Sequence, residues 1–172
     1  MRREGSAVFE FTESIVVEAP PAAVWPVLCD LENWWVASNP EHESLERLDD
    51  KGISVGARLR IREKVAGVPG EYIGELTRVE ELSTVTMEAP AARYRLFGIP
   101  FTIGEGVTWR IEPMRDHASR ISARVWATFP AGLLGRAVEW IFVHLLNGIE
   151  RDREHARVEL RHLKRIIETP LS

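Results

Sequence analysis

The sequence predicts an α+β domain, spanning residues 1–172, in which a curved antiparallel sheet of seven strands wraps around one long C-terminal helix. From Ala131 to Glu168 the apolar residues fall three and four positions apart, which is the spacing of a helix with one buried stripe. Between residues 43 and 128 apolar residues alternate with polar ones, which indicates strands buried on one face. The chain has no internal repeat and no long linker, so we expect a single domain.

The start of the chain predicts one strand and two short helices. Within residues 8–18 the apolar side chains of Phe9, Phe11, Ile15 and Val17 stand at odd positions, which is typical of a half-buried strand. Pro20 and Pro21 end this strand. Residues 22–31 and 30–38 have the composition and the apolar spacing of helices.

Six more strands are predicted by the alternation and by the turn residues between them. Their expected ranges are 43–50, 58–66, 71–81, 84–89, 107–112 and 121–128. Because one face is apolar and the other charged, the sheet should be antiparallel and covered on one side only. Residues 91–106 leave two alternatives open, a mobile lid or an ordinary hairpin whose apolar residues pack down.

The predicted last helix lies between Pro130 and Pro170 and would be about 55 Å long. A helix of this length is not stable alone, so its apolar stripe needs a surface to cover. The sheet is expected to supply that surface.

Composition and charge exclude several classes of protein. A formal charge of −4 gives no reason to expect binding to nucleic acid or to an anionic membrane. The single cysteine, Cys29, excludes a disulfide scaffold, and no signal-like apolar run opens the chain, so we expect a cytoplasmic protein. The most apolar window, residues 132–149, contains Arg136, Glu139 and His144, which makes it a poor membrane span.

Three stretches carry a resemblance to a known family. They are SIVVEAPPAAVW at residues 14–25, CDLENWW at 29–35 followed by Asn39-Pro40, and GARL at 56–59. With these motifs the chain resembles the START, polyketide cyclase/dehydrase and lipid transport superfamily (SRPBCC), whose architecture is the helix-grip fold. The resemblance implies a cavity between sheet and long helix that holds an apolar or aromatic small molecule without a cofactor. The oxygenase branch would need two histidines and a carboxylate around iron, and the predicted sheet and its loops contain no matching histidine pair.

The predicted binding surface is the apolar face of the sheet together with the first half of the last helix. The candidate ligand-binding residues are Leu59, Ile61, Met87, Trp109, Val125, Leu134, Val138, Ile141 and Leu145. Ligand pockets are mostly apolar with a few polar groups, which fits this set. The alternative is that these residues fill one another's space as a closed core.

Two polar residues are weak candidates for catalysis, and no catalytic residue is assigned. Alternation places Glu63 on the inward face, where burial would raise the pKa of its carboxyl and suit it to general acid/base chemistry. A rim position would instead leave Glu63 in water. His144 lies about 60° from Ile141 around the helix and could pair with such a carboxylate, or be an ordinary boundary residue.

Metal binding and self-association are the remaining site hypotheses. The spacing of His155, Glu159 and His162 could hold zinc, but the surrounding arginines and lysine would repel a cation. We therefore expect a solvated helix face there and no metal site. Residues 140–143 are apolar nearly all round, so part of this run could contact a second copy in a homodimer.

Three functions follow from these observations. The first is binding of a lipid-like or aromatic small molecule, and the second is a polyketide cyclase/dehydrase-type enzyme acting on a cyclic substrate. The third is a protein-interaction module. A buried Glu63 within reach of His144 would favour the enzyme. A cavity lined only by carbon atoms would favour the small-molecule binding protein. A filled core with an exposed apolar groove would favour the protein-interaction module.

Overall fold

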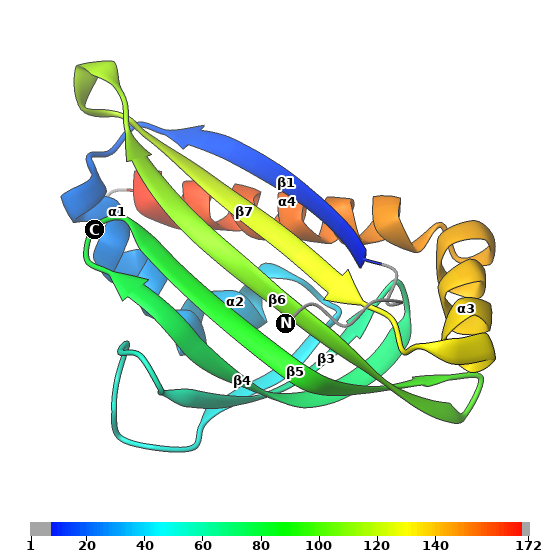
Figure 1. Cartoon of the computed structure of the whole chain (residues 1–172). Helices are drawn as coiled ribbons and strands as arrows, with labels where there is room; N and C mark the ends of the chain where they lie inside the picture. Colours follow the sequence, from blue (N-terminus) through cyan, green and yellow to red (C-terminus); the bar gives the residue numbers. More distant parts are fainter. Residues whose placement is uncertain (1–7, 170–172) are drawn as a thin grey trace.

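A seven-stranded antiparallel sheet curves around a C-terminal helix in the described part of the chain (Figure 1). The structure is a computed structural model, and it describes residues 8–169. The strands follow the order β1-β7-β6-β5-β4-β3-β2, so β1 and β2 lie at opposite edges, β1 pairs with β7, and the other five neighbouring pairs are consecutive in the chain. This arrangement confirms the predicted α+β helix-grip fold.

The elements follow one another in the predicted order, with two short helices after the first strand. The strands are β1 (Val8–Val17), β2 (His42–Arg47), β3 (Arg58–Val65), β4 (Val68–Glu80), β5 (Thr84–Leu96), β6 (Ile99–Pro113) and β7 (Ser119–Thr128). The helices are α1 (Pro21–Cys29), α2 (Leu31–Ser38), the 3-10 turn η1 (Arg115–His117), α3 (Gly132–Trp140), the π-helical turn η2 (Ile141–Leu145) and α4 (Gly148–Glu168).

Residues 91–106 form a hairpin and are not a separate lid. Strand β5 continues to Leu96 and β6 begins at Ile99, two strands that pair with each other. The two residues between them, Phe97 and Gly98, both have positive φ values of 50° and 80°. Such a turn matches the right-handed twist of its two strands, so the sheet extends outward as one long ribbon.

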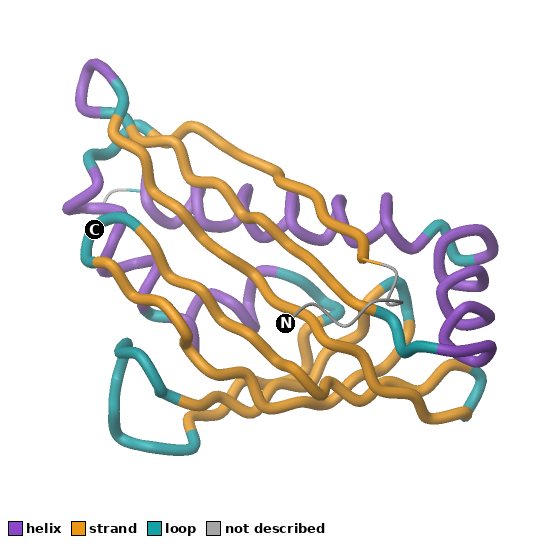
Figure 2. The backbone as a smooth tube through the Cα atoms, viewed as in Figure 1, coloured by secondary structure: helices purple, strands orange, loops and turns teal. Residues whose placement is uncertain are grey.

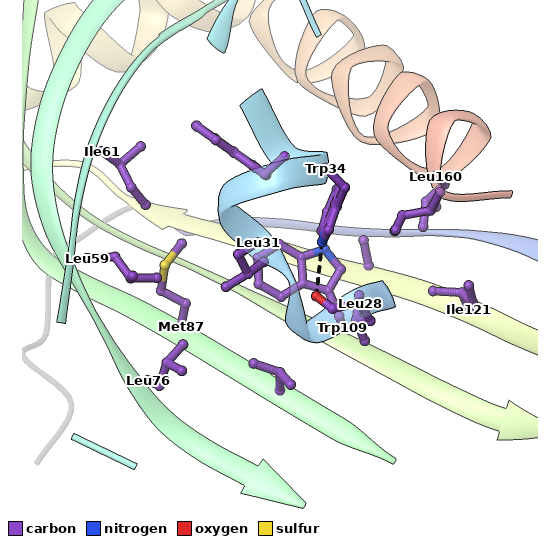
Figure 3. Close-up of a cluster of buried hydrophobic side chains, with 14 of the residues drawn as sticks. Leu28, Leu31, Trp34, Leu59, Ile61, Leu76, Met87, Trp109, Ile121 and Leu160 are labelled. Carbon is purple, nitrogen blue, oxygen red and sulfur yellow. Dashed lines mark hydrogen bonds between the residues drawn. The ribbon is translucent and has the colours of Figure 1, made fainter. Parts of the chain in front are cut away.

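The core lies between the concave face of the sheet, α1, α2 and α4. Helix α4 buries Ala156, Leu160 and Leu163 in it. Trp34 of α2 packs edge-on against Trp109 of β6 with ring centroids 6.0 Å apart, and its indole N–H donates to the Leu28 carbonyl at 2.9 Å (Figure 3). Each fully buried large apolar side chain stabilises the fold by about 1.5–3 kcal/mol relative to an exposed one.

The prediction of one unbroken helix from residue 131 to 168 is wrong. The chain forms α3, passes through η2, and starts α4 only after Asn147, whose φ of 50° and ψ of 41° are left-handed. A π-helical turn followed by a left-handed residue changes the direction of the helix axis. Helix α3 therefore turns away from the α4 axis at one end of the sheet (Figure 2).

None of the described helices is both long enough and apolar enough to cross a membrane.

Candidate functional site

A pocket of about 110 Å³ lies between the concave face of the sheet and α4. Strands β5, β6 and β7 supply much of its apolar wall, through Met87, Ala89, Val107, Trp109, Val125 and Ala127. A dry apolar cavity of about 150 Å³ admits benzene, so this volume is of the order of one aromatic ring.

Only part of the predicted binding surface faces this pocket. Met87, Trp109 and Val125 line it, and their role as ligand contacts stays a prediction. Leu59 and Ile61 are 1% and 0% exposed, and they pack in the core beside the pocket.

The candidates from the first half of the last helix lie elsewhere. Leu134 and Leu145 are 57% and 63% exposed, Val138 is buried outside the pocket, and Ile141 packs half-buried against the core. The expectation that these four face the cavity is wrong because the turn at Asn147 carries α3 away from the sheet.

Three phenylalanines close the end of the pocket near this break. Phe9 of β1, Phe129 after β7 and Phe142 of η2 have ring centroids 5.8 to 6.0 Å apart. All three line the pocket. The π-helical turn thus contributes one side chain, Phe142, to the site even though α3 itself lies outside it.

Trp109 has a side chain on the pocket wall, and its buried indole N–H has no partner in the part of the chain that the structure describes. Trp109 is 2% exposed, and its Nε1 makes no hydrogen bond within residues 8–169. A buried donor left unpaired costs about 1–3 kcal/mol. A buried donor of this kind calls for a partner outside the described residues, such as a water or a bound molecule.

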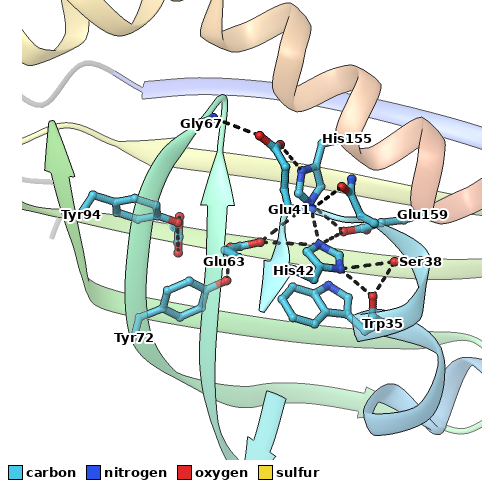
Figure 4. A network of polar contacts seen from close by, with 12 residues as sticks. Trp35, Ser38, Glu41, His42, Glu63, Gly67, Tyr72, Tyr94, His155 and Glu159 are labelled. Carbon is cyan, nitrogen blue, oxygen red and sulfur yellow. Dashed lines mark hydrogen bonds and ion pairs between the residues drawn. The ribbon is translucent and has the colours of Figure 1, made fainter. Parts of the chain in front are cut away.

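Two carboxyl–tyrosine pairs also lie on the wall (Figure 4). The Tyr72 hydroxyl donates to Glu63 at 2.6 Å, and the Tyr94 hydroxyl lies 2.9 and 3.1 Å from the two Glu105 oxygens. Glu63 is 6% exposed, so it has the inward position that alternation indicates and not the rim position.

Burial dominates the acid–base properties of these groups. It raises the pKa of Glu105 well above the ordinary value, and the charge of Glu63 adds to the effect. It also raises the pKa of Glu63, against the opposing charges of His155 and His42. Burial raises the pKa of both tyrosines well above 10 and that of Asp152, on α4, to about 7.

Beside Glu63, two histidines and a further carboxylate converge (Figure 4). His42, at the start of β2, and His155, on α4, place their Nε2 atoms 2.6 Å apart. Oε1 of Glu159 lies 3.1 and 3.3 Å from these nitrogens, and Oε2 of Glu63 lies 3.7 and 3.8 Å from them. The ring of Trp35 stacks on His42 with centroids 3.5 Å apart.

This arrangement overturns the expectation of a solvated helix face. His155 and Glu159 are each 7% exposed, because they lie on the side of α4 that faces the sheet. Burial opposes charge on His155, but hydrogen bonding to Glu159 and its charge raise the pKa of His155 to about 10. Burial likewise opposes charge on Glu159, but its hydrogen bonds with the histidines lower its pKa to about 2. His162 is half-buried and is not part of the group.

His144 does not take the predicted position. It is exposed on η2, where its ring lies 5.5 Å from that of Trp140, and it is not among the residues that line the pocket. The histidines that approach Glu63 are His42 and His155. The predicted pairing of Glu63 with His144 is therefore wrong.

The sequence analysis missed Glu105 and His42 as residues of the site, and only Glu105 had a signal in the sequence that could have revealed it. Glu105 has the same parity as Val107, Trp109 and Ile111, so the alternation of β6 already placed it on the buried face. His42 had no such signal, because it lies 113 positions from His155 and only the fold brings the two together.

Comparisons with known proteins agree with this architecture. Residues 8–168 match the sequence model of the family described as polyketide cyclase / dehydrase and lipid transport. The crystal structure of the aromatase/cyclase Zhui from Streptomyces sp. R1128 superposes with a TM-score of 0.67 at 17% identity, covering 94% of each chain. Truncated norcoclaurine synthase from Thalictrum flavum superposes with a TM-score of 0.60 at 14% identity, covering 99% of this chain and 100% of that one.

A conserved protein from Geobacillus kaustophilus has a TM-score of 0.65 at 14% identity, covering 92% of this chain and 95% of that one. At such identities the likeness concerns the fold alone. No curated protein sequence matches the chain.

Proposed function

Because the chain belongs to the polyketide cyclase / dehydrase and lipid transport family, we propose that its pocket binds a small, mainly apolar molecule with an aromatic ring and a hydrogen-bond acceptor. The family and the fold support binding of a hydrophobic ligand in general. The aromatic ring and the acceptor are inferred from the pocket of this chain.

The observation that carries the proposal is Trp109, whose side chain lines the pocket and whose buried indole N–H has no partner among residues 8–169. A carbonyl, ether or phenolic oxygen on the ligand would accept from it. Met87 and Val125 line the same pocket and would contact the apolar body of the ligand. The ligand must be small, since the pocket has the volume of about one ring.

A pair of similarly shaped probes tests the proposal. Acetophenone carries a ring and one carbonyl oxygen, whereas ethylbenzene has the ring and no acceptor. Native mass spectrometry would first show whether a ligand co-purifies with the protein, and any such ligand would be removed. Calorimetry would then give the Kd of each probe. The variant Trp109→Phe keeps an aromatic ring and loses the N–H, and Trp25→Phe on α1, outside the pocket, is the matched control.

The native protein should prefer acetophenone, and Trp109→Phe should lose about 2- to 10-fold of that preference, because a net hydrogen bond contributes about 0.5–1.5 kcal/mol. Trp25→Phe should keep the native ratio. The proposal fails if neither probe binds, or if both variants leave the ratio unchanged.

A second candidate function is acid/base catalysis on such a ligand, and the Tyr94–Glu105 pair favours it. Burial holds the pKa of the Glu105 carboxyl well above its ordinary value, so its protonated form would donate a proton to the ketone oxygen while a solvent water removes a proton from the adjacent methyl carbon, which gives the enol. The carboxyl lies on the pocket wall, so a bound ketone would be within its reach.

The corresponding test follows exchange of the acetophenone methyl protons with D₂O by NMR. The protein should accelerate this exchange, and Glu105→Gln should abolish the acceleration. Glu88→Gln, an exposed substitution on β5, should have no effect. If acetophenone binds but its methyl protons exchange no faster than in free solution, the protein binds the ketone without catalysing the exchange, and the second candidate function is wrong.

A further inference from the structure

The group formed by His42, His155 and Glu159 directs three donor atoms to one point beside the pocket (Figure 4). Their donor atoms all lie within 4.8 Å of one another, and all three residues are buried. We propose that this group binds a divalent transition-metal ion, with zinc as the expected ion and Glu63 as the donor nearest the fourth position. The proposal does not depend on which small molecule the pocket binds.

The hydrogen bonds of the two imidazole rings orient them as metal ligands. Nδ1 of His42 lies 2.6 Å from the Trp35 carbonyl oxygen, and Nδ1 of His155 lies 3.2 Å from a carboxylate oxygen of Glu41. Carbonyl and carboxylate oxygens only accept, so each Nδ1 donates its proton outward, and Nε2 is the ring nitrogen that can bind a metal ion in place of a proton. Metal-binding histidines are fixed in the same way by an acceptor at the second ring nitrogen.

These acceptors are themselves held in place. The Glu41 carboxylate accepts the backbone N–H of Gly67 at 3.1 Å, and Trp35 stacks on the His42 ring at 3.5 Å. Helix α4 and strand β2 therefore present the two rings at a fixed mutual orientation.

Two Nε2 lone pairs at 2.6 Å repel unless a positive charge lies between them. A proton could supply that charge by converting one ring to imidazolium, and it would need one carboxylate as counter-charge. The structure provides two, because Glu159 and Glu63 both approach the same two nitrogens. Two neutral imidazoles, two carboxylates and one divalent cation sum to zero charge, which is the favourable balance in a buried site.

The spacing of the donors fits tetrahedral coordination. With zinc–ligand distances of about 2.0–2.1 Å, neighbouring donors of a tetrahedron lie about 3.3 Å apart. The observed separations of 3.1 and 3.3 Å between Glu159 and the two rings match this value, whereas those of 3.7 and 3.8 Å from Glu63 are longer. To complete a tetrahedron Glu63 has to move inward, and the two rings, at 2.6 Å, have to separate, each by a fraction of an ångström. Imidazole with carboxylate suits zinc, whereas calcium and magnesium prefer oxygen alone.

Carboxylates offset the charges of the arginines on α4 that the reasoning from sequence set against an ion. Arg153 pairs with Glu13 of β1, Arg157 with Glu13 and Glu150, and Arg161 with Glu154. Arg151, one turn before His155 on the same face, is exposed and lies 3.9 Å from an oxygen of Glu41.

The test uses protein freed of metal with a chelator and then titrated with Zn²⁺ by calorimetry. Co²⁺ is the spectroscopic probe, because its visible spectrum reports tetrahedral coordination. The variants are Glu159→Gln and His155→Gln, and the matched control is His162→Gln on the same helix, outside the group. Far-UV circular dichroism verifies that each variant folds, and Glu63→Gln, which keeps the hydrogen bond from Tyr72, is an additional variant if one does not.

The native protein and His162→Gln should bind one Zn²⁺ with the same Kd, and Zn²⁺ should raise their Tm because it binds the folded state. Glu159→Gln and His155→Gln should weaken binding at least 10-fold and lose the tetrahedral Co²⁺ spectrum. Absence of Zn²⁺ binding by the native protein would overturn the proposal. Binding that Glu159→Gln and His155→Gln leave unchanged would overturn it as well, since the ion would then lie elsewhere.

Discussion

Replacing Ala89 by leucine should fill part of the pocket and stabilise the protein without ligand. Ala89 is buried on β5 and its side chain forms part of the pocket wall. An unfilled cavity costs about 24 cal/mol per Å³, so a volume of about 110 Å³ corresponds to about 2.6 kcal/mol as an upper limit. Three added carbons contribute about 0.8 kcal/mol each on burial, less about 0.5–1 kcal/mol for fixing the side chain. We expect a gain of about 1–2 kcal/mol in the free energy of unfolding.

Ala123→Leu is the matched control, because Ala123 is equally buried on β7 but packs in the core outside the pocket. Adding three carbons to a filled core typically costs about 1–3 kcal/mol. Urea unfolding curves would give the midpoints and slopes of both variants. Equal destabilisation by Ala89→Leu and Ala123→Leu would refute the reasoning, since no free space would then exist beside Ala89. Ala89→Leu should also abolish acetophenone binding.

Four further predictions concern other parts of the chain. Asn147→Gly should preserve the free energy of unfolding, and Asn147→Val should lower it by about 1–2 kcal/mol in urea unfolding, because φ there is 50°. Burial raises the pKa of Cys29 from 9.0 to about 11, so iodoacetamide at about pH 8 should label the native thiol about 100-fold more slowly than in unfolded protein; equal rates would contradict this. Because the pKa of Glu105 is higher in the folded than in the unfolded chain, ionising Glu105 destabilises the fold as pH rises above about 4.5. Glu105→Gln should therefore gain stability relative to the native protein as pH increases in urea unfolding, and a constant difference would be evidence against a buried carboxyl. Leu134 and Trp140 expose apolar surface on α3, so light scattering should show a dimer that Leu134→Glu returns to monomer mass, and a monomeric native protein would contradict this.

Most of the fold could be predicted from the sequence because side chains along a strand alternate between the two faces of the sheet, and this alternation is visible in the sequence. The alternation around Trp109 and the inward position of Glu63 follow from the period of two alone. Family motifs at strand and helix ends then distinguished this architecture from other α+β folds.

The features of the structure that could not be predicted from the sequence depend on the backbone angles of single residues and on contacts between residues far apart in the chain. The apolar spacing continues through Asn147, so periodicity cannot detect a left-handed residue that ends one helix and starts another. The partnership of His42 with His155 joins the edge strand to the last helix, and no local pattern encodes it. The charges that surround Glu159 in the sequence suggested a solvated surface, although Glu159 itself is buried and Arg153, Arg157 and Arg161 are paired with carboxylates.

The measurement that tests the central claim most directly is diffraction from ligand-free crystals pressurised with xenon, which occupies apolar cavities. An internal chamber predicts a xenon peak in contact with Met87, Trp109 and Val125, the three predicted ligand contacts on its wall. If these side chains instead touch one another and no xenon enters the protein, the interior is a closed core and the ligand chamber does not exist.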